Sequence, residues 1–360
     1  MAKQKYISID KMVKQNFHYN ILIGARSNGK SFQVKRHCLD QAYRNPEHKF
    51  VYLRRYQIES KAADVEGYFR DAPVMDITAG AFSRIVVYRG SIYFANTDPE
   101  TGKTIRGGCC GYVAYLSNEQ HFKSQNFNDV SEIIFEEFIS ENNGYIYREH
   151  ERLQSFISTV ARKRKIRVWM IGNTISRTCP YFSAYSLDHI NDMKPGSIDT
   201  YEHHTDQVDE DGKPVVIRIG VYFTEQPQNN SKMFFGTFSK MTTGGSWQTR
   251  EYPVLPYHYR DCKKLYEMLL KFEKFLFKIE VIKSPESEYM LFVHPHKGKT
   301  EGIRMLDKDP SPSPLITKKL QIVKRGDALV AELARKNKIY FSDNLTGSDW
   351  EGVMKEMGSL

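Results

Sequence analysis

The segment from Gly24 to Ser31 reads GARSNGKS and matches the spacing G-x-x-x-x-G-K-S. Glycines at these positions let backbone N–H groups crowd around an anion, because no Cβ intrudes. In such a loop the ammonium group of Lys30 reaches the β- and γ-phosphates of a nucleotide, and the hydroxyl group of Ser31 holds Mg²⁺. The residues expected to surround the phosphates are Gly24, Ser27, Asn28, Gly29, Lys30 and Ser31. The segment therefore predicts a site for ATP and Mg²⁺.

The flanks of this segment decide between a phosphate-binding loop and a glycine-containing turn that matches by accident. A β-like run, Asn20 to Ile23, precedes the loop, and a helix-compatible run from Ser31 to about Asn45 follows it. A helix in that position directs its positive N-terminal end at the phosphates. The flanks therefore favour the phosphate-binding loop.

Two adjacent glutamates supply the second half of the expected site. The sequence EIIFEE places Glu136 and Glu137 directly after the apolar run Ile133 to Phe135. In P-loop folds a carboxylate at the end of such a strand addresses the metal, and hydrolysis needs a further group to position water. We therefore expect Glu136 in the Mg²⁺ shell and Glu137 as the base that orients and deprotonates the attacking water. The alternative is that both glutamates merely end a buried strand in solvent.

Glu136 departs from the usual pattern, because aspartate is more common at this position. Its extra methylene pushes the carboxylate outward, which leaves open a metal contact through water or a shifted loop. Asn173, in the sequence MIGNT, ends the next apolar strand. Its side chain either senses the γ-phosphate beside the attacking water or forms an ordinary hydrogen bond at the strand end.

A dense basic run, ARKRKIR, extends from Ala161 to Arg167 and ends a predicted helix just before that strand. Three interpretations remain open on the residues alone. The run is a solvated helix end that the helix dipole favours, a contact with DNA phosphates, or the source of an arginine that reaches a neighbouring subunit's nucleotide.

Composition narrows the class of protein. The net charge is +9 and the isoelectric point is about 9.1, which favours a polyanionic partner. Five cysteines without a C-x-x-C pair argue for a reducing compartment and against a disulfide framework or a zinc site. No apolar run approaches the ~18 residues of a membrane span, and the first ten residues are too polar for a signal peptide. We therefore expect a cytosolic protein without membrane contact.

The pattern of the chain predicts two domains joined by a linker. Strand-like and helix-like segments alternate over residues 1–205, which predicts an α/β domain with a central sheet flanked by helices. Turn formers and acidic residues dominate 206–250, so we interpret this segment as a linker. Residues 251–360 begin a new pattern of helices and strands, typical of a smaller α+β domain.

Four motifs together resemble a known family. The segments ILIGARSNGKS, FVYLRRY, SEIIFEEF and STVARKR, the last followed by GN, occur in the order found in the DNA-packaging motor ATPases of small, protein-primed podophages. These ATPases are compact relatives of the terminase large subunit. The resemblance covers roughly residues 15–200, whereas the last third of the chain is matched only loosely.

The resemblance implies an additional-strand, catalytic-glutamate (ASCE) P-loop ATPase domain and a smaller domain of RNase H-like type. It implies that Glu137 is the catalytic base and that Arg162 acts in trans on a neighbour's nucleotide, with Arg164 as the alternative. It gives Asn173 the role of linking the γ-phosphate state to motion. It also places Arg26, Arg54 and Arg55 near the nucleotide, the last two with the subunit interface as the alternative.

The resemblance also implies the partners. Such ATPases form a homo-oligomeric ring, taken here as a pentamer, at the portal of an empty procapsid in the host cytoplasm, and they drive double-stranded DNA inward. A packaging RNA is a further candidate partner. The carboxylates Glu280, Asp307, Asp309 and Asp343 are scattered, so we expect a nuclease fold without nuclease activity. Lysines such as Lys318, Lys319 and Lys324 would contact DNA, portal or RNA.

Two rival functions stay open. One is another P-loop DNA translocase or a helicase-type ATPase, which would share the same core. The other is a non-catalytic nucleic-acid-binding protein whose nucleotide site has degenerated, which the glutamate at position 136 makes conceivable.

Overall fold

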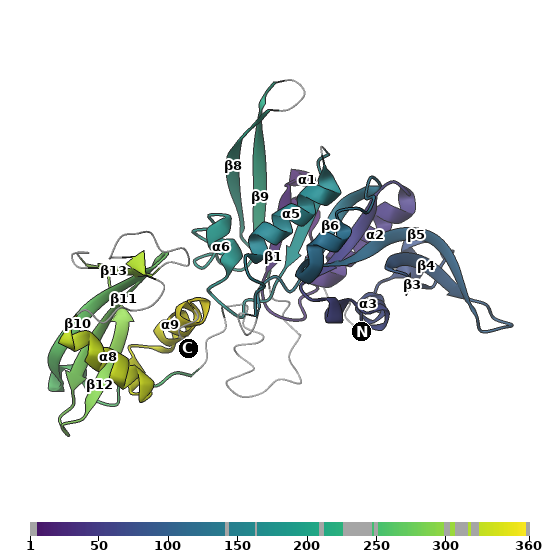
Figure 1. Cartoon of the computed structure of the whole chain (residues 1–360). Coiled ribbons are helices and arrows are strands. Elements are labelled where there is room, and N and C mark those ends of the chain that lie inside the picture. Colours follow the sequence, from purple (N-terminus) through teal and green to yellow (C-terminus); the bar gives the residue numbers. More distant parts are fainter. Residues whose placement is uncertain are drawn as a thin grey trace. The chain divides into compact units, whose positions relative to one another are not determined.

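The chain is described by a computed structural model over residues 6–140, 144–162, 164–208, 212–225, 247, 251–298, 303–306, 316–317 and 324–357. It divides into two compact units (Figure 1). Unit 1 comprises Met1–Thr174 and His189–Trp247, and unit 2 comprises Ile175–Asp188 and Gln248–Leu360. In the ranges given above, no helix is long and apolar enough to cross a membrane.

Unit 1 is built on a mixed sheet. Its strands, in spatial order, are β3 (Arg84–Tyr88), β4 (Ser91–Thr97), β5 (Thr104–Tyr115), β2 (Lys49–Arg54), β6 (Val130–Glu136), β7 (Arg167–Ile171), β1 (Tyr19–Ile23), β9 (Pro214–Phe223) and β8 (Ile198–Val208). The strands from β5 to β9 in this order are parallel, whereas the pairs β3–β4, β4–β5 and β8–β9 are antiparallel. The carboxyl ends of the parallel strands therefore meet at one edge.

The order of the central strands confirms a P-loop-type α/β fold. The loop strand β1 and the acidic strand β6 are not neighbours, because β7 lies between them and pairs with both. Val168 of β7 is the register partner of Tyr19 on one side and of Ile133 on the other. One parallel strand, β7, therefore separates the loop strand from the acidic strand.

Helices cover both faces of this sheet (Figure 1). They are α1 (Asp10–Gln15), α2 (Lys30–Arg44), α3 (Ala62–Phe69), α4 (Val74–Ile77) and α5 (Glu149–Ala161), with 3-10 turns η1 (Gln57–Ser60) and η2 (Leu116–Phe122). α2 buries Val34, Cys38 and Leu39 in one core with Leu22 and Trp169 of the sheet. α5 buries Leu153, Phe156 and Val160. The helix expected from Ser31 is thus confirmed as α2, which starts one residue earlier.

The interpretation of residues 206–250 as a linker is wrong over its described first part. β8 continues to Val208. The second half of β9 pairs in parallel with the whole of β1, with Ile219 opposite Tyr19. β8 and β9 form an antiparallel pair in the sheet, in which the apolar residues Ile219, Val221 and Phe223 of β9 are buried. Residues 226–246 and 248–250 lie outside the described residues.

Unit 2 contains a second sheet. Its strands, in spatial order, are β14 (Ile316–Thr317), β13 (Ile303–Leu306), β10 (Lys263–Phe272), β11 (Phe275–Lys283), β12 (Tyr289–Pro295) and β15 (Ile339–Phe341). Its helices are α6 (Pro180–Ala184), α8 (Arg325–Arg335) and α9 (Asn344–Glu356), with the 3-10 turn η3 (Tyr259–Asp261). β10, β11 and β12 form an antiparallel meander, and β13 joins β10 in parallel. α8 and α9 share one apolar core with the meander.

The position of β9 in the unit 1 sheet can be tested at Gly220. A Cβ added there would lie 2.3 Å from the ring of Phe17, whereas a Cβ at Gly108 on β5 would meet nothing within 4 Å. We expect Gly220→Val to lower the free energy of unfolding of unit 1 by about 1–3 kcal/mol through overpacking, measured by chemical denaturation. Gly108→Val is the matched control and should change it little. Equal stability of the two variants would contradict the packing of β9 described here.

Candidate nucleotide-binding site

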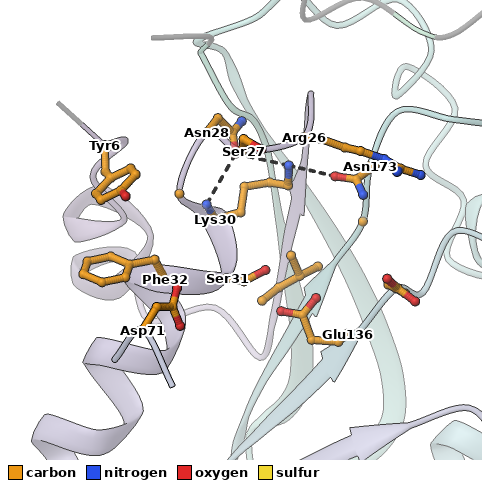
Figure 2. A pocket seen from close by; sticks show the side chains of 14 residues that line it. Tyr6, Arg26, Ser27, Asn28, Lys30, Ser31, Phe32, Asp71, Glu136 and Asn173 are labelled. Carbon is orange, nitrogen blue, oxygen red and sulfur yellow. Dashed lines mark hydrogen bonds between the residues drawn. The ribbon is translucent and has the colours of Figure 1, made fainter. Parts of the chain in front are cut away.

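The loops that follow β1, β6 and β7 surround one cavity at the carboxyl edge of the unit 1 sheet (Figure 2). Its volume is about 400 Å³. The lining residues are Tyr6, Arg26, Ser27, Asn28, Gly29, Lys30, Ser31, Phe32, Asp71, Glu136, Glu137, Ile171, Gly172 and Asn173. Residues from three predicted motifs therefore meet in space, as the shared edge of parallel strands requires.

The loop between β1 and α2 depends on its two glycines. Gly24 has φ +150° and Gly29 has φ +93°, a region that side chains with a Cβ rarely adopt. A Cβ at Gly24 would also lie 2.1 Å from the hydroxyl oxygen of Thr224, which follows β9. The Asn28 amide donates a hydrogen bond to that same hydroxyl group. β9, which lies in the segment that the sequence assigns to a linker, therefore helps to fix the conformation of the loop.

Lys30 is the first residue of α2, and its ammonium group is buried inside the loop. It donates hydrogen bonds to the carbonyl oxygens of Ala25 (2.6 Å) and Gly24 (3.2 Å). It also donates to the side-chain oxygens of Asn28 (3.2 Å) and Asn173 (3.3 Å). Burial lowers the pKa of Lys30 from 10.5 to about 7, although the nearby Glu136 opposes this shift. The four oxygens that accept these hydrogen bonds are therefore all uncharged.

Glu136 and Glu137 differ sharply in surroundings. Glu136 is buried at the end of β6 and accepts a hydrogen bond of 2.6 Å from the Tyr68 hydroxyl group at Oε1. Burial raises the pKa of Glu136, and hydrogen bonds from Tyr68 and Ser31 act in the opposite direction. Glu137 is exposed and has φ +57°. Arg54 donates to its Oε2 over 2.9 Å. One carboxylate is thus fixed beside Ser31, while the other faces the open cavity.

The paired arginines after β2 have different places. Arg54 reaches Glu137 and also Glu59, at 3.3 Å. Neither arginine is among the residues that line the cavity. The buried guanidinium of Arg55 forms a two-pronged pair with Glu149 at the start of α5. Arg55 also donates to the carbonyl oxygens of Glu137 and Phe138. Arg54 therefore contacts the side chain of the candidate catalytic glutamate, whereas Arg55 contacts the backbone of Glu137 and of the residue after it.

Arg162 and Arg164 lie away from the cavity of their own chain. They follow α5 near the start of β6, whereas Glu136 stands at that strand's other end. Arg162 is exposed where α5 ends. Arg164 donates hydrogen bonds to the carbonyl oxygens of Phe127, Val130 and Val160. The guanidinium group of Arg164 is therefore hydrogen-bonded within its own chain, whereas Arg162 lies at the surface.

Comparison with known proteins identifies the family. The model of the Podovirus DNA encapsidation protein (Gp16) family matches residues 1–202. The chain belongs to this family. The DNA packaging proteins of Bacillus phages phi29 and PZA are each 32% identical to it over 191 residues, which is 52% of this chain and 52% of theirs. The chain thus spans about half the length of the curated relatives it matches.

A solved structure of the bacteriophage Phi-29 viral genome packaging motor assembly resembles the Gp16-family chain in fold. The TM-score is 0.54 at 21% sequence identity, and the match covers 98% of this chain and 99% of that one. At this identity the likeness concerns the fold alone.

The donor set of this Gp16-family site fits a hard divalent cation. The hydroxyl group of Ser31 and the carboxylate of Glu136 lie together, and oxygen ligands of this kind suit Mg²⁺, which usually binds one or two carboxylates plus phosphates and waters. Over the described part of the chain, no group of three or more His, Cys, Asp or Glu side chains could hold a metal ion. Ser31 and Glu136 are therefore the residues that would hold Mg²⁺.

Several cavity residues of this Gp16-family chain were missed by the sequence patterns. The ring of Tyr6 lies 4.9 Å from that of Phe32, at the side of the cavity away from Asn173 (Figure 2). Asp71 lines the cavity from beyond α3 and pairs with Lys35. Phe32 follows Ser31 directly, so the loop motif could have predicted its place beside the cavity. No motif marks Tyr6 or Asp71.

The buried ammonium group predicts a pH dependence of stability. Between the folded pKa of about 7 and the ordinary value of 10.5, the unfolded chain binds more protons than the folded one, so stability rises with pH. Lys30→Met removes this contribution. The stability advantage of the variant over the wild type, measured by denaturation without nucleotide, should shrink by up to about 1.4 kcal/mol per pH unit above pH 7.5. Lys14→Met, at an exposed lysine, is the control. An advantage that does not change with pH would contradict the buried state of Lys30.

Proposed function

We propose that the chain is a subunit of an ATP-driven motor that packages viral double-stranded DNA. The observation that carries this proposal is the meeting of Lys30, Glu137 and Asn173 around one cavity, next to Ser31 and Glu136. A loop for phosphates, a carboxylate for the metal and a carboxylate for water are the parts that nucleotide hydrolysis requires. The relatives from phages phi29 and PZA carry the name DNA packaging protein.

In this proposal the loop binds the triphosphate and the aromatic side of the cavity binds the nucleoside. The N–H groups of the loop and the start of α2 face the phosphates, and Lys30 exchanges its carbonyl contacts for phosphate oxygens. Ser31 and Glu136 would hold Mg²⁺, which would supply positive charge to the phosphates. The rings of Tyr6 and Phe32 lie close enough together to offer an apolar surface to a base.

Hydrolysis would use Glu137 as the general base. Its carboxylate is exposed to the cavity, so a water molecule can reach it. Arg54 pairs with Oε2 of this carboxylate, so the proposal assigns the proton to the other oxygen, Oε1. Asn173 lies beside Lys30 and would contact the γ-phosphate. Arg162, exposed where α5 ends, would complete the site of a neighbouring subunit.

Coupling to DNA would follow from a ring of subunits around the duplex. The net charge of +9 suits contacts with phosphates, which carry no sequence information and so suit a motor that moves along any sequence. The pentameric form of the ring, the portal and a packaging RNA as partners, and a place at the procapsid portal in the host cytoplasm belong to the same proposal.

Unit 2 is proposed to be an RNase H-like domain without nuclease activity. The order β12–β11–β10–β13–β14, with a meander and two following parallel strands, supports that fold. Of the scattered carboxylates, Glu280 accepts from Tyr259 and pairs with Lys278, and Asp343 caps α9 through Thr346. Asp307, Asp309, Lys318 and Lys319 lie outside the described residues.

The rival functions make different predictions. A helicase-type ATPase would unwind duplex DNA, whereas a packaging motor moves it intact. A non-catalytic nucleic-acid-binding protein would hydrolyse no ATP at all. The open position of Glu137 beside the loop favours an enzyme over that last alternative.

Replacing the base tests the proposed chemistry. We expect Glu137→Gln to lower ATP turnover by about 10²–10⁴-fold while nucleotide affinity stays close to that of the wild type. Glu59→Gln is the matched control, because Glu59 is the other carboxylate partner of Arg54 and does not line the cavity. Turnover and nucleotide binding are measured separately. A wild-type chain without turnover, or a Glu137→Gln variant with normal turnover, would overturn the assignment.

Mixing two inactive variants tests the trans-acting arginine. Lys30→Ala removes the phosphate contact, and Arg162→Ala removes the group proposed to act on the neighbour. Combined with procapsids and DNA, the two variants should recover ATPase activity that neither shows alone, because some interfaces then contain an intact loop and an intact arginine. Arg164→Ala in place of Arg162→Ala separates the two candidates. Normal turnover by Arg162→Ala alone would place the trans-acting group elsewhere.

A further inference from the structure

The carboxylate of Glu136 is held from outside the sheet by a tyrosine that no sequence motif marks. Tyr68, in the last turn of α3, donates its hydroxyl hydrogen to Oε1 of Glu136 over 2.6 Å. Glu136 is 6% exposed, so protein groups rather than bulk water orient its carboxylate. The bond engages one carboxylate oxygen and leaves the group's remaining acceptor capacity for Ser31 and the cavity.

This contact answers a geometric problem that glutamate creates at this position. A glutamate side chain has one more rotatable bond than an aspartate, so its carboxylate samples more positions at the end of a strand. A metal ligand must be fixed in direction, and hydrogen-bonding partners behind it commonly do this. The hydroxyl group of Tyr68 stands in that relation to Glu136.

Tyr68 is itself held in place by its neighbours. The ammonium group of Lys35 lies 4.4 Å from the centre of its ring and donates to its carbonyl oxygen over 2.6 Å. The ring of Tyr52, on β2, lies 4.5 Å from that of Tyr68. Lys35 also pairs with Asp71, just beyond α3. These contacts fix the direction of the hydroxyl group before any ligand arrives.

We propose that Tyr68 is a positioning residue for Mg²⁺ binding, whose hydroxyl group holds Glu136 in the orientation that completes the site with Ser31. The inference rests on the proposed function, because it assigns Glu136 to the metal. It extends that function by giving α3 a part in metal binding, and it explains how a glutamate serves where an aspartate is usual.

The variant Tyr68→Phe tests this role, because it removes one oxygen atom and keeps the ring contacts with Lys35 and Tyr52. With a non-hydrolysable ATP analogue bound, we expect the affinity for Mn²⁺, used as a spectroscopic substitute for Mg²⁺, to fall about 10–100-fold. The affinity for the same analogue without divalent cation should stay within twofold. Electron paramagnetic resonance measures the metal, and fluorescence titration measures the nucleotide.

Tyr112→Phe is the matched control. It removes a tyrosine hydroxyl that bonds the carboxylate of Asp129 over 2.9 Å, just before β6 begins and therefore at the opposite end of that strand from Glu136. It should leave both affinities unchanged. An equal loss of metal affinity in Tyr112→Phe would mean that the effect is general destabilisation, and it would overturn the proposal.

A double-mutant cycle separates positioning from a merely structural role. Glu136→Asp shortens the side chain and withdraws it from the Tyr68 hydroxyl group. In that background Tyr68→Phe should cause no further loss of metal affinity, so the two effects should be non-additive. Additive losses, or a Tyr68→Phe variant that binds Mn²⁺ as the wild type does, would refute the proposal. If the wild type itself binds no metal–nucleotide complex, the proposed function fails first, which distinguishes the two failures.

Discussion

The buried ammonium group of Lys30 constrains the rest of unit 1. A charge withdrawn from water must be surrounded by acceptors, and these come from Gly24 and Ala25 after β1 and from Asn173 after β7. Those segments meet because β1 and β7 are parallel neighbours, whose carboxyl ends lie at the same edge of the sheet. These acceptors are neutral, and burial lowers the pKa of Lys30 to about 7 although the nearby Glu136 raises it. A bound triphosphate would place further negative charge beside this group.

Arginines behind the cavity connect the nucleotide site to the surface expected to face a neighbour. Arg55 bonds the backbone after Glu137 and pairs with Glu149, where α5 begins. α5 then runs to Arg162. Removing one member of such a buried pair typically costs about 3–5 kcal/mol. The pair therefore ties the backbone at Glu137 and Phe138 to the start of the helix that ends beside Arg162, the proposed trans-acting residue.

Much of unit 1 could be predicted because each of its motifs determines a local backbone structure. The glycine spacing around Lys30 and the apolar run before Glu136 each specify a local structure, and parallel strands then bring them together. Tyr68, Thr224 and Tyr6 could not be found, because they reach the site through tertiary contacts that leave no periodic pattern. The sequence of 206–223 predicts a linker because turn formers and acidic residues are frequent in it, whereas the pairing of β9 with β1 depends on residues about 200 positions away. In unit 2 the carboxylates are scattered along the sequence, so they form no motif from which a site could be predicted.

The most direct test of the account is calorimetric titration with a non-hydrolysable ATP analogue and Mg²⁺ at pH 8.5, in buffers of different ionisation enthalpy. Lys30 is mostly neutral at that pH in the empty site, because its pKa is about 7, and a bound triphosphate should restore its charge. The account predicts binding accompanied by uptake approaching one proton. Absence of binding, or binding without proton uptake, would contradict the claim that a bound triphosphate restores the positive charge of the buried Lys30 side chain.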